Sequence, residues 1–219
     1  AVRERIDTAR RAAGRDDDVT LVVVTKFFPA TDVRLLADLG VTDVGENRHQ
    51  EAETKAHECA DLGLRWHFIG GLQSNKAAAV ARYAHAVHSV DRPKVVGPLD
   101  RGAHERSHPV DVLLQVSLDP PGRDHRSGAA PDDLDRLAEA VEEAGMLRLR
   151  GLMAVAPLGE APAAAFDRLA DVRARFLPGH PDATWLSAGM SADLEAAIAV
   201  GATHVRIGSA VLGSRPEVK

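Results

Sequence analysis

Short apolar runs alternate with helical patterns along the whole chain, and this rhythm constrains the fold more than any other feature. The runs are rich in β-branched residues and almost wholly apolar, as is typical of strands covered by helices on both faces. We predict eight strands, at residues 21–24, 41–44, 65–70, 86–90, 110–117, 149–155, 184–187 and 204–208. Helices are predicted between them and over residues 2–13, ahead of the first strand.

Strands that alternate with helices form parallel sheets, and eight such units match a (β/α)8 barrel. We therefore predict the α/β class and a single TIM-barrel domain over residues 1–219, with one extra helix before the first strand. Each predicted strand except the last is followed by a helix. An open, doubly wound sheet is the alternative arrangement of the same units.

Composition narrows the classes of function. The formal charge is -5 with acidic and basic residues interspersed, so nothing predicts binding to nucleic acid or to a membrane surface. The single cysteine, Cys59, excludes an internal disulfide and multi-cysteine metal sites, and we predict no metal. No apolar run is long enough to span a membrane, and the start lacks the apolar segment of a signal peptide. We predict a cytoplasmic monomer and leave open a cleaved leader, because the chain does not begin with methionine.

One lysine follows the first strand at an unusual place. Residues 21–24 are all leucine or valine, and Lys26 comes directly before the two phenylalanines and Pro29 that end the run. Burying an ammonium group is costly unless the group is paired or neutralised. Lys26 is therefore either a functional residue or a lysine at the barrel mouth that reaches water or a carboxylate. This stretch alone does not choose between the two.

Polar residues gather where other strands end, and in a (β/α)8 barrel the site lies at those carboxyl ends. The strand ends deliver Lys26, Glu46, Asn47, Arg48, His67, Met153, Ser187, Arg206, Gly208 and Ser209. Phosphate sites in this fold are commonly built from the last two strand ends and a following helix. A lysine across the barrel from a phosphate cradle is the arrangement that a pyridoxal phosphate enzyme needs, because the amine forms a Schiff base while the opposite wall holds the phosphate.

Several stretches carry a family resemblance, and they occur in order along nearly the whole chain. They are residues 23–26 (VVTK), 45–48 (GENR), 66–76 (WHFIGGLQSNK), 151–153 (GLM), 186–194 (LSAGMSADL) and 206–213 (RIGSAVLG). On these residues the chain resembles the YggS/PROSC family of pyridoxal-phosphate-binding homeostasis proteins, which share the barrel of alanine racemase.

The resemblance implies a fold type III barrel with pyridoxal 5'-phosphate as cofactor and Lys26 as the Schiff-base residue. It also implies that Ser187 and the amides of Gly208 and Ser209 hold the phosphate, while Arg206 faces the pyridine nitrogen. The implied function is pyridoxal phosphate homeostasis, which means storing, buffering or delivering the cofactor without turnover. The implied partners are apo forms of pyridoxal-phosphate-dependent enzymes.

Two further site residues follow from the resemblance, which also has a consequence for the chemistry. Asn47 is expected to contact the ring or its substituents, and Met153 to pack nearby. A guanidinium group does not readily accept a proton, so an arginine at the ring nitrogen leaves it unprotonated and weakens the ring as an electron sink. An arginine there favours carrying the cofactor over turnover.

The alternative function is a pyridoxal-phosphate-dependent amino-acid racemase of the same barrel. Racemisation needs proton donors and acceptors on both faces of the substrate, and alanine racemases take the second from a tyrosine of an added C-terminal domain. The only tyrosine here, Tyr83, is predicted to lie in a helix far from the site, and the chain ends soon after the last strand. We therefore expect no racemase activity.

The chain departs from the family pattern at three places. Gly71 and Ala188 stand where a larger residue and a methionine are usual, and residues 119–128 lack the usual Glu-x-x-Lys-x-Gly. Residues 119–130 are rich in proline, glycine and charge, and we predict a mobile loop at the barrel mouth. The departure leaves a role for this loop in releasing the cofactor open.

The roles of other polar residues near the strand ends stay open at this point. His67 is predicted to be a hydrogen-bonded core histidine. Glu46 and Arg48 either form an ion pair beside the site or shape the loop that carries them. Residues 73–76 either cap the next helix or form a surface for a partner.

Overall fold

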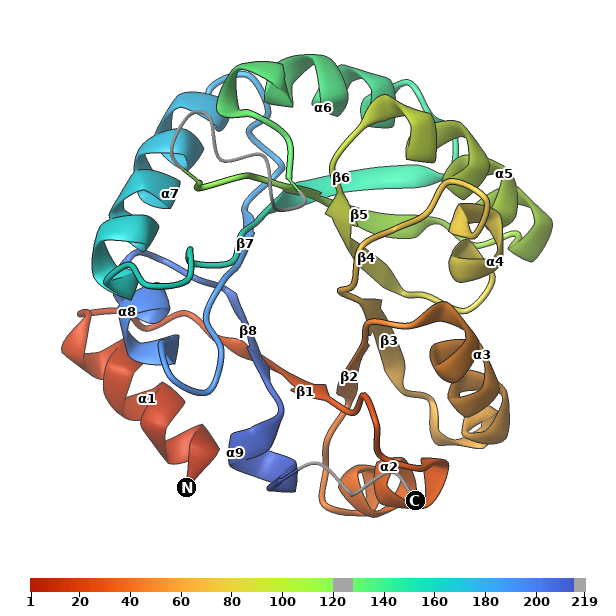
Figure 1. Cartoon of the computed structure of the whole chain (residues 1–219), viewed down its shortest axis with the longest axis horizontal. Coiled ribbons are helices and arrows are strands. Elements are labelled where there is room, and N and C mark those ends of the chain that lie inside the picture. Colours follow the sequence, from red (N-terminus) through yellow and green to blue (C-terminus); the bar gives the residue numbers. More distant parts are fainter. Residues whose placement is uncertain (120–127, 215–219) are drawn as a thin grey trace.

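A closed barrel of eight parallel strands forms the centre of the computed structural model, which describes residues 1–119 and 128–214 (Figure 1). The strands follow one another around the barrel in sequence order. They are β1 (Thr20–Val24), β2 (Asp43–Glu46), β3 (Arg65–Phe68), β4 (Ala86–Val90), β5 (Val110–Gln115), β6 (Leu147–Met153), β7 (Trp185–Ser187) and β8 (His204–Ile207). The predicted (β/α)8 barrel is confirmed.

Pairing between the first and last strands closes the barrel. Strand β1 pairs with β8 in parallel, from Thr20 opposite His204 to Val23 opposite Ile207. An open, doubly wound sheet leaves two unpaired edges, whereas here every strand pairs with a neighbour on each side. The alternative arrangement is therefore excluded.

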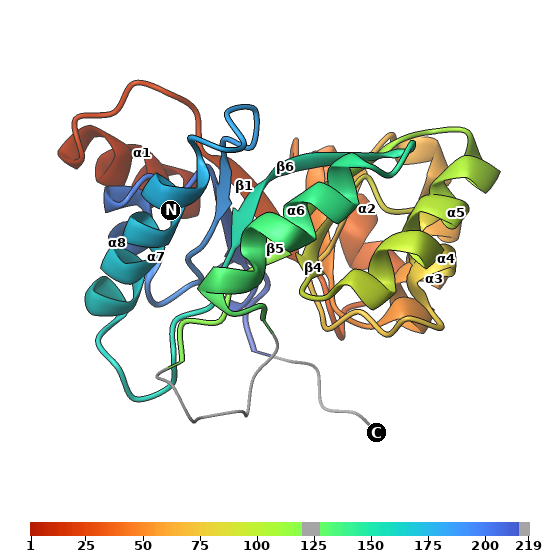
Figure 2. The same cartoon turned by 90° about the horizontal axis from the view of Figure 1, so that it is seen from above.

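Helices surround the strands, with α3, α4 and α5 on one side of the barrel and α7, α8 and α1 on the other (Figure 2). The α-helices are α1 (Val2–Ala12), α2 (Ala30–Asp38), α3 (His49–Glu58), α4 (Ala77–Ala81), α5 (Val96–Arg106), α6 (Leu134–Glu142), α7 (Pro162–Phe176), α8 (Leu194–Ala199) and α9 (Ser209–Leu212). Short 3-10 turns lie at η1 (Ala60–Leu62), η2 (Pro93–Val95) and η3 (Pro131–Asp133). The predicted N-terminal helix is confirmed as α1, which lies beside α8 (Figure 1).

The structure adds one helix to the predicted elements and shifts most strand boundaries by one or two residues. A short helix, α9, follows the last strand, where no helix was predicted, because four residues are too few to show a helical period. Strand β2 begins at Asp43 instead of residue 41, and β6 at Leu147 instead of residue 149. In β2 the pairing with β3, from Asp43 opposite Arg65 to Glu46 opposite Phe68, overrides the weak strand preference of Asp, Gly and Glu.

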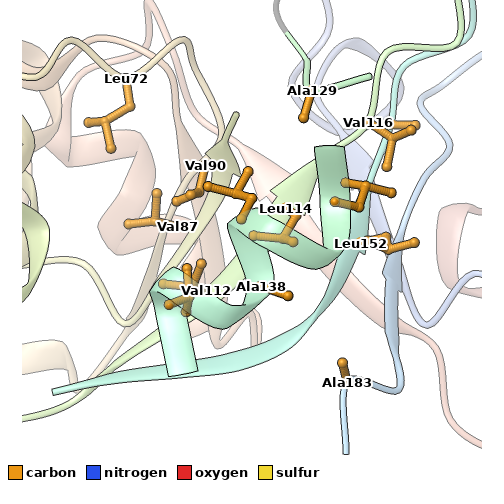
Figure 3. Close-up of a cluster of buried hydrophobic side chains, with 14 of the residues drawn as sticks. Leu72, Val87, Val90, Val112, Leu114, Val116, Ala129, Ala138, Leu152 and Ala183 are labelled. Carbon is orange, nitrogen blue, oxygen red and sulfur yellow. The ribbon is translucent and has the colours of Figure 1, made fainter. Parts of the chain in front are cut away.

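The largest apolar cluster lies between the strands and the outer helices. Figure 3 shows part of it, where side chains of β4, β5 and β6 meet Ala138 of α6. The aliphatic residues Val87, Val112, Leu114 and Leu152 are fully buried there. This packing makes the outer shell rigid and leaves the strand ends to carry the site.

The predicted mobile loop falls mostly outside the described residues, which omit 120–127. Within the described ranges, no helix has the length and apolarity that crossing a membrane requires. The same ranges hold no cluster of His, Cys, Asp and Glu arranged to bind a metal ion.

Candidate functional site

A pocket of about 310 Å³ opens at the carboxyl ends of β1 and β8. Its walls combine apolar side chains with two cationic ones and with small residues. They are Val24, Lys26, Phe27, Phe28, Ile69, Met190, Ser191, Ala192, Arg206, Gly208, Ser209 and Gly213. Four of the six predicted site residues, Lys26, Arg206, Gly208 and Ser209, thus meet in one pocket. Because β1 and β8 are neighbours, Lys26 lies on the same side of the barrel as Gly208 and Ser209 and not across from them as expected.

The backbone on both sides of Lys26 is held by a buried ion-pair cluster. Lys55 of α3 donates to the carbonyl oxygen of Thr25 (2.8 Å), and Glu51 Oε1 accepts from the amide of Phe27 (2.6 Å). Phe27 has a φ of 72°, which is uncommon for a residue other than glycine. The two peptide groups that flank Lys26 are therefore fixed by side chains of α3. This fixes the position of the Lys26 Cα atom and the direction in which its side chain begins.

Lys55 itself is almost fully buried, with 5% of its surface exposed. Its ammonium lies 2.7 Å from Glu46 Oε1 and 2.7 Å from Glu51 Oε1. Burial raises the pKa of Glu46, and the hydrogen bonds from Lys55 and Thr25 oppose this rise. Glu46 thus pairs with Lys55, whereas the Arg48 guanidinium lies 5.1 Å from the centre of the Phe27 ring.

Arg206 forms the polar floor of the pocket. Its side chain is 4% exposed, and burial lowers its pKa to about 10, so it stays charged at neutral pH. One terminal nitrogen donates to Ser187 Oγ (2.6 Å) and the other to the carbonyl oxygen of Ala154 (2.9 Å). These two bonds fix the plane of the guanidinium from behind.

Ser187 lies behind Arg206 and does not line the pocket. It is fully buried, and its hydroxyl is bonded both to Arg206 and to His88 Nδ1, 2.9 Å away. The geometry therefore gives the predicted phosphate contact of Ser187 no support. From its position in the LSAGMS stretch, Ser187 could contact a phosphate or support Arg206 from the interior. Only the direction of its side chain distinguishes these two roles.

Ser191, four residues further on, lines the pocket. Ser209 Oγ lies 3.3 Å from Ser191 Oγ, and the amide of Ala210 lies 3.4 Å from it. The first turn of α9 and the loop after β7 thus bring two hydroxyl groups and the amide of Ala210 together at the rim. Donors of this kind suit a phosphate group.

Asn47 lies beside the pocket wall and does not form part of it. A side chain at Gly70 would place its Cβ 2.2 Å from the Asn47 carbonyl oxygen, so the turn after β3 requires glycine there. Within the described residues the buried Asn47 Oδ1 has no hydrogen-bond partner. A buried acceptor without a donor is unusual and leaves room for a ligand donor.

Other open residues near the strand ends are now placed. His67 is buried and bonded at both ring nitrogens, to His88 and to Asp43, as predicted for a core histidine. No side chain caps α4, so residues 73–76 do not act as its cap through a side chain. Met153 is 2% exposed and lies in β6, outside the pocket lining.

Buried neutral histidines make stability depend on pH. Burial lowers the pKa of His204 to about 3, whereas an unfolded histidine titrates near 6.5. As the pH falls below about 6.5 the unfolded chain binds a proton that the folded chain does not, so the free energy of unfolding falls by about 1.4 kcal/mol per pH unit for this group. We measure the free energy of unfolding in urea at pH 7 and at pH 5. Between these two pH values, His204→Asn is expected to lose less of it than the unsubstituted protein does. His57→Asn, on the exposed face of α3, is the control, and an equal loss in both variants contradicts this assignment.

Comparison with known proteins places the chain in a family. The family described as "Alanine racemase, N-terminal domain" matches residues 1–216. The chain belongs to this family. Within it, a protein of Mycobacterium leprae named pyridoxal phosphate homeostasis protein is 44% identical over 97% of this chain and 89% of its own length. A protein of the same name from Pseudomonas aeruginosa is 48% identical over 98% of this chain and 93% of its own length.

Solved structures agree with this alanine racemase N-terminal domain fold. PipY of Synechococcus elongatus PCC7942, with PLP bound, superposes with a TM-score of 0.83 at 35% identity and covers 97% of this chain and 100% of its own. Alanine racemase of Corynebacterium glutamicum, at 16% identity, superposes with a TM-score of 0.66 over 99% of this chain and 62% of its own, which reflects the fold alone. The resemblance to the YggS/PROSC family is confirmed.

Sequence reasoning missed residues that act from outside the strand ends. Lys55 and Glu51 lie on α3 and show no periodicity that separates them from a solvated helix face. Ser191 stood inside a recognised stretch but was not singled out. The Asp43–His67–His88 contacts join three strands, and a one-dimensional pattern does not report such contacts.

Proposed function

We propose that this protein binds pyridoxal phosphate in the pocket between β1 and β8 and serves in its homeostasis, without turning over a substrate. The observation that carries the proposal is that Lys26 and Arg206 line one pocket with two serine hydroxyls at its rim. The names of the relatives and the cofactor bound to PipY support it. The hydroxyl groups at the rim suit a ligand with a phosphate group.

Lys26 is assigned as the covalent anchor. When bound, pyridoxal phosphate supplies an aldehyde that condenses with a primary amine to form a carbon–nitrogen double bond and release water. The peptide groups on either side of Lys26 are fixed, and its side chain lines the pocket. Phe27, Phe28 and Ile69 supply apolar surface beside it.

Arg206 is assigned to the pyridine nitrogen of the ligand. Its guanidinium donates hydrogen bonds and accepts none, so it leaves a ring nitrogen unprotonated. A ring without that proton stabilises negative charge poorly, which disfavours racemisation. The assignment therefore supports a carrier of the cofactor over an enzyme.

Reconstitution tests the function as a whole. The purified protein is incubated with pyridoxal phosphate, and its absorbance spectrum is recorded before and after borohydride reduction. The loaded protein is then mixed with an apo enzyme that depends on pyridoxal phosphate, and recovery of that enzyme's activity is measured. We expect binding, recovery and no racemisation of alanine above free cofactor. Stereospecific turnover by the pure protein contradicts the homeostasis assignment, and failure to bind contradicts the cofactor.

The rim serines make a prediction about the phosphate group. Ser191→Ala and Ser209→Ala are expected to reduce the preference for pyridoxal phosphate over pyridoxal by about tenfold each, since hydrogen bonds to a charged group are the strong ones. Affinities for both ligands are measured by fluorescence titration. Thr54→Ala removes an exposed hydroxyl from α3 and serves as control. An unchanged ratio in both serine variants rules the rim out as the phosphate site.

A further inference from the structure

A continuous row of hydrogen-bonded side chains crosses the interior of the barrel and ends at Arg206. From Arg206, the row runs to Ser187 Oγ (2.6 Å), His88 Nδ1 (2.9 Å from Ser187), His67 Nδ1 (2.9 Å from His88 Nε2) and Asp43 Oδ1 (2.9 Å from His67 Nε2). We name these five residues the barrel chain. All five are buried, with between 0% and 4% of their surface exposed.

The barrel chain spans the width of the barrel. Its members come from β2, β3 and β4 on one side and from β7 and β8 on the other (Figure 1). Strands β4 and β7 are not neighbours, so the contact between His88 and Ser187 must pass through the interior. The two ends differ, since Arg206 lines the pocket whereas Asp43 pairs with Arg65, whose side chain is 50% exposed.

When both imidazoles are neutral, the two ends fix the direction of every hydrogen bond between them. Arg206 only donates, and an ionised Asp43 only accepts. His67 must therefore donate from Nε2 to Asp43, and when neutral it accepts at Nδ1. His88 then donates from Nε2 and accepts at Nδ1, where the Ser187 hydroxyl donates while its oxygen accepts from Arg206. With both imidazoles neutral, all four bonds point from the guanidinium towards the carboxylate.

The charges around the barrel chain favour this direction. Hydrogen bonds from His67 and Arg65 hold the pKa of Asp43 below its usual value, against the effect of burial, so it stays ionised. Burial lowers the pKa of His88 well below 6.5, and neighbouring His67, His204, Arg206 and His85 act in the same direction. A neutral His88 between a cation and an anion is thus the expected form at neutral pH.

We propose that the barrel chain is a positioning device, in which the distant Asp43 carboxylate orients Arg206 towards the pocket through His67, His88 and Ser187. Hydrogen bonds in a row polarise one another, so the negative charge at one end strengthens the hold on the guanidinium at the other. The identity of the ligand that Arg206 faces rests on the proposed function. The inference that Asp43 orients Arg206 does not depend on that function.

A purely structural role makes a different prediction. Interior polar groups must be hydrogen-bonded to avoid a desolvation penalty, and local pairing alone satisfies that need. Under local pairing, a change at Asp43 affects its neighbours and the stability of the fold but leaves Arg206 unaltered. Under the proposal, the effect of a change at Asp43 is transmitted through the four hydrogen bonds of the barrel chain to the Arg206 guanidinium.

The first test needs no cofactor and no variant. Nitrogen-15 NMR of the ligand-free protein at neutral pH reports which ring nitrogen of each histidine carries the proton. We expect both His67 and His88 to carry a proton at Nε2, and His88 to carry none at Nδ1. A proton on Nδ1 of either neutral ring, or a doubly protonated His88, overturns the direction of the barrel chain.

The second test changes the far end of the barrel chain. Asp43→Asn keeps the size of the side chain and removes its charge, and Arg65→Gln breaks the same ion pair while leaving Asp43 charged. We expect the guanidinium protons of Arg206 to exchange with water about fivefold faster in Asp43→Asn and to be unaltered in Arg65→Gln. Equal exchange rates in Asp43→Asn and the unsubstituted protein overturn the proposal.

A matched pair at His88 tests the middle of the barrel chain. His88→Asn places an acceptor near the former Nδ1 and keeps the Ser187 half, whereas His88→Gln places a donor near the former Nε2 and keeps the His67 half. Both variants interrupt the hydrogen bonds of the barrel chain, so both are expected to speed the exchange of the Arg206 guanidinium protons with water. Faster exchange in His88→Gln alone indicates local pairing of Ser187 and contradicts transmission from Asp43.

Affinity for pyridoxal phosphate separates this inference from the proposed function. We expect about fivefold weaker binding by Asp43→Asn than by Arg65→Gln. If the unsubstituted protein does not bind pyridoxal phosphate, the proposed function fails while the NMR results still decide the barrel chain. If it binds and Asp43→Asn binds equally well, the cofactor assignment stands and the positioning role fails.

Discussion

Lys26→Ala is expected to abolish the visible absorbance that pyridoxal phosphate acquires on binding. It is also expected to abolish the label that borohydride reduction leaves on the peptide that contains residue 26. Lys26 is the lysine that lines the pocket, and its neighbouring peptide groups are held by Lys55 and Glu51. Alanine has no side-chain amine, so no carbon–nitrogen double bond forms at residue 26 in this variant. Absorbance spectra and peptide mass analysis measure both effects.

The control for this variant is another lysine. Lys94→Ala removes an exposed lysine from η2 and is expected to keep the spectrum and the label. Non-covalent binding through Arg206 and the rim serines is expected to persist in Lys26→Ala, with lower affinity. A full label on a different lysine in the unsubstituted protein contradicts the assignment of Lys26.

Lys55→Met is expected to have the largest effect on stability. The variant leaves Glu46, which is 1% exposed, without its cation, and breaking a buried ion pair from one side costs about 3–5 kcal/mol. For a chain of this size each kcal/mol lowers the melting temperature by about 2–4 °C, so a decrease of roughly 6–20 °C is expected. Calorimetry or circular dichroism measures it.

A second substitution and a change of pH separate charge from packing in this variant. Adding Glu46→Gln to Lys55→Met removes the unpaired carboxylate and is expected to recover more than half of the lost stability. Without Lys55, the folded pKa of Glu46 lies above its unfolded value, so the carboxylate destabilises the fold as the pH rises through the unfolded pKa. The deficit of Lys55→Met is therefore expected to shrink towards acidic pH, and a deficit that is independent of pH points to packing alone.

The Lys55 variant also bears on the site, because the same ammonium holds the carbonyl of Thr25. Once that bond is lost, the backbone before Lys26 is no longer fixed from α3. A lysine that must meet an aldehyde in one orientation depends on such support. Stability and cofactor binding are thus linked through one buried cluster.

Much of this protein was predictable from local sequence. The alternation of apolar β-branched runs with helices determined the eight-stranded barrel, since period and composition are local properties that each segment carries by itself. Lys26, Arg206, Gly208 and Ser209 were identified because they lie at or just after strand ends, which parallel strands bring to one edge of the barrel, and because the stretches that carry them resemble a known family.

The tertiary structure decided what depends on the direction of a side chain. Ser187 and Ser191 lie in one stretch, yet Ser187 points into the interior to Arg206 while Ser191 lines the pocket. Lys55 looked like a residue of a polar helix until the packing of α3 buried it against β1 and β2. The contacts of Asp43, His67 and His88 join three neighbouring strands, whereas His88 meets Ser187 from a distant part of the sequence, so the row that ends at Arg206 forms only when the barrel closes.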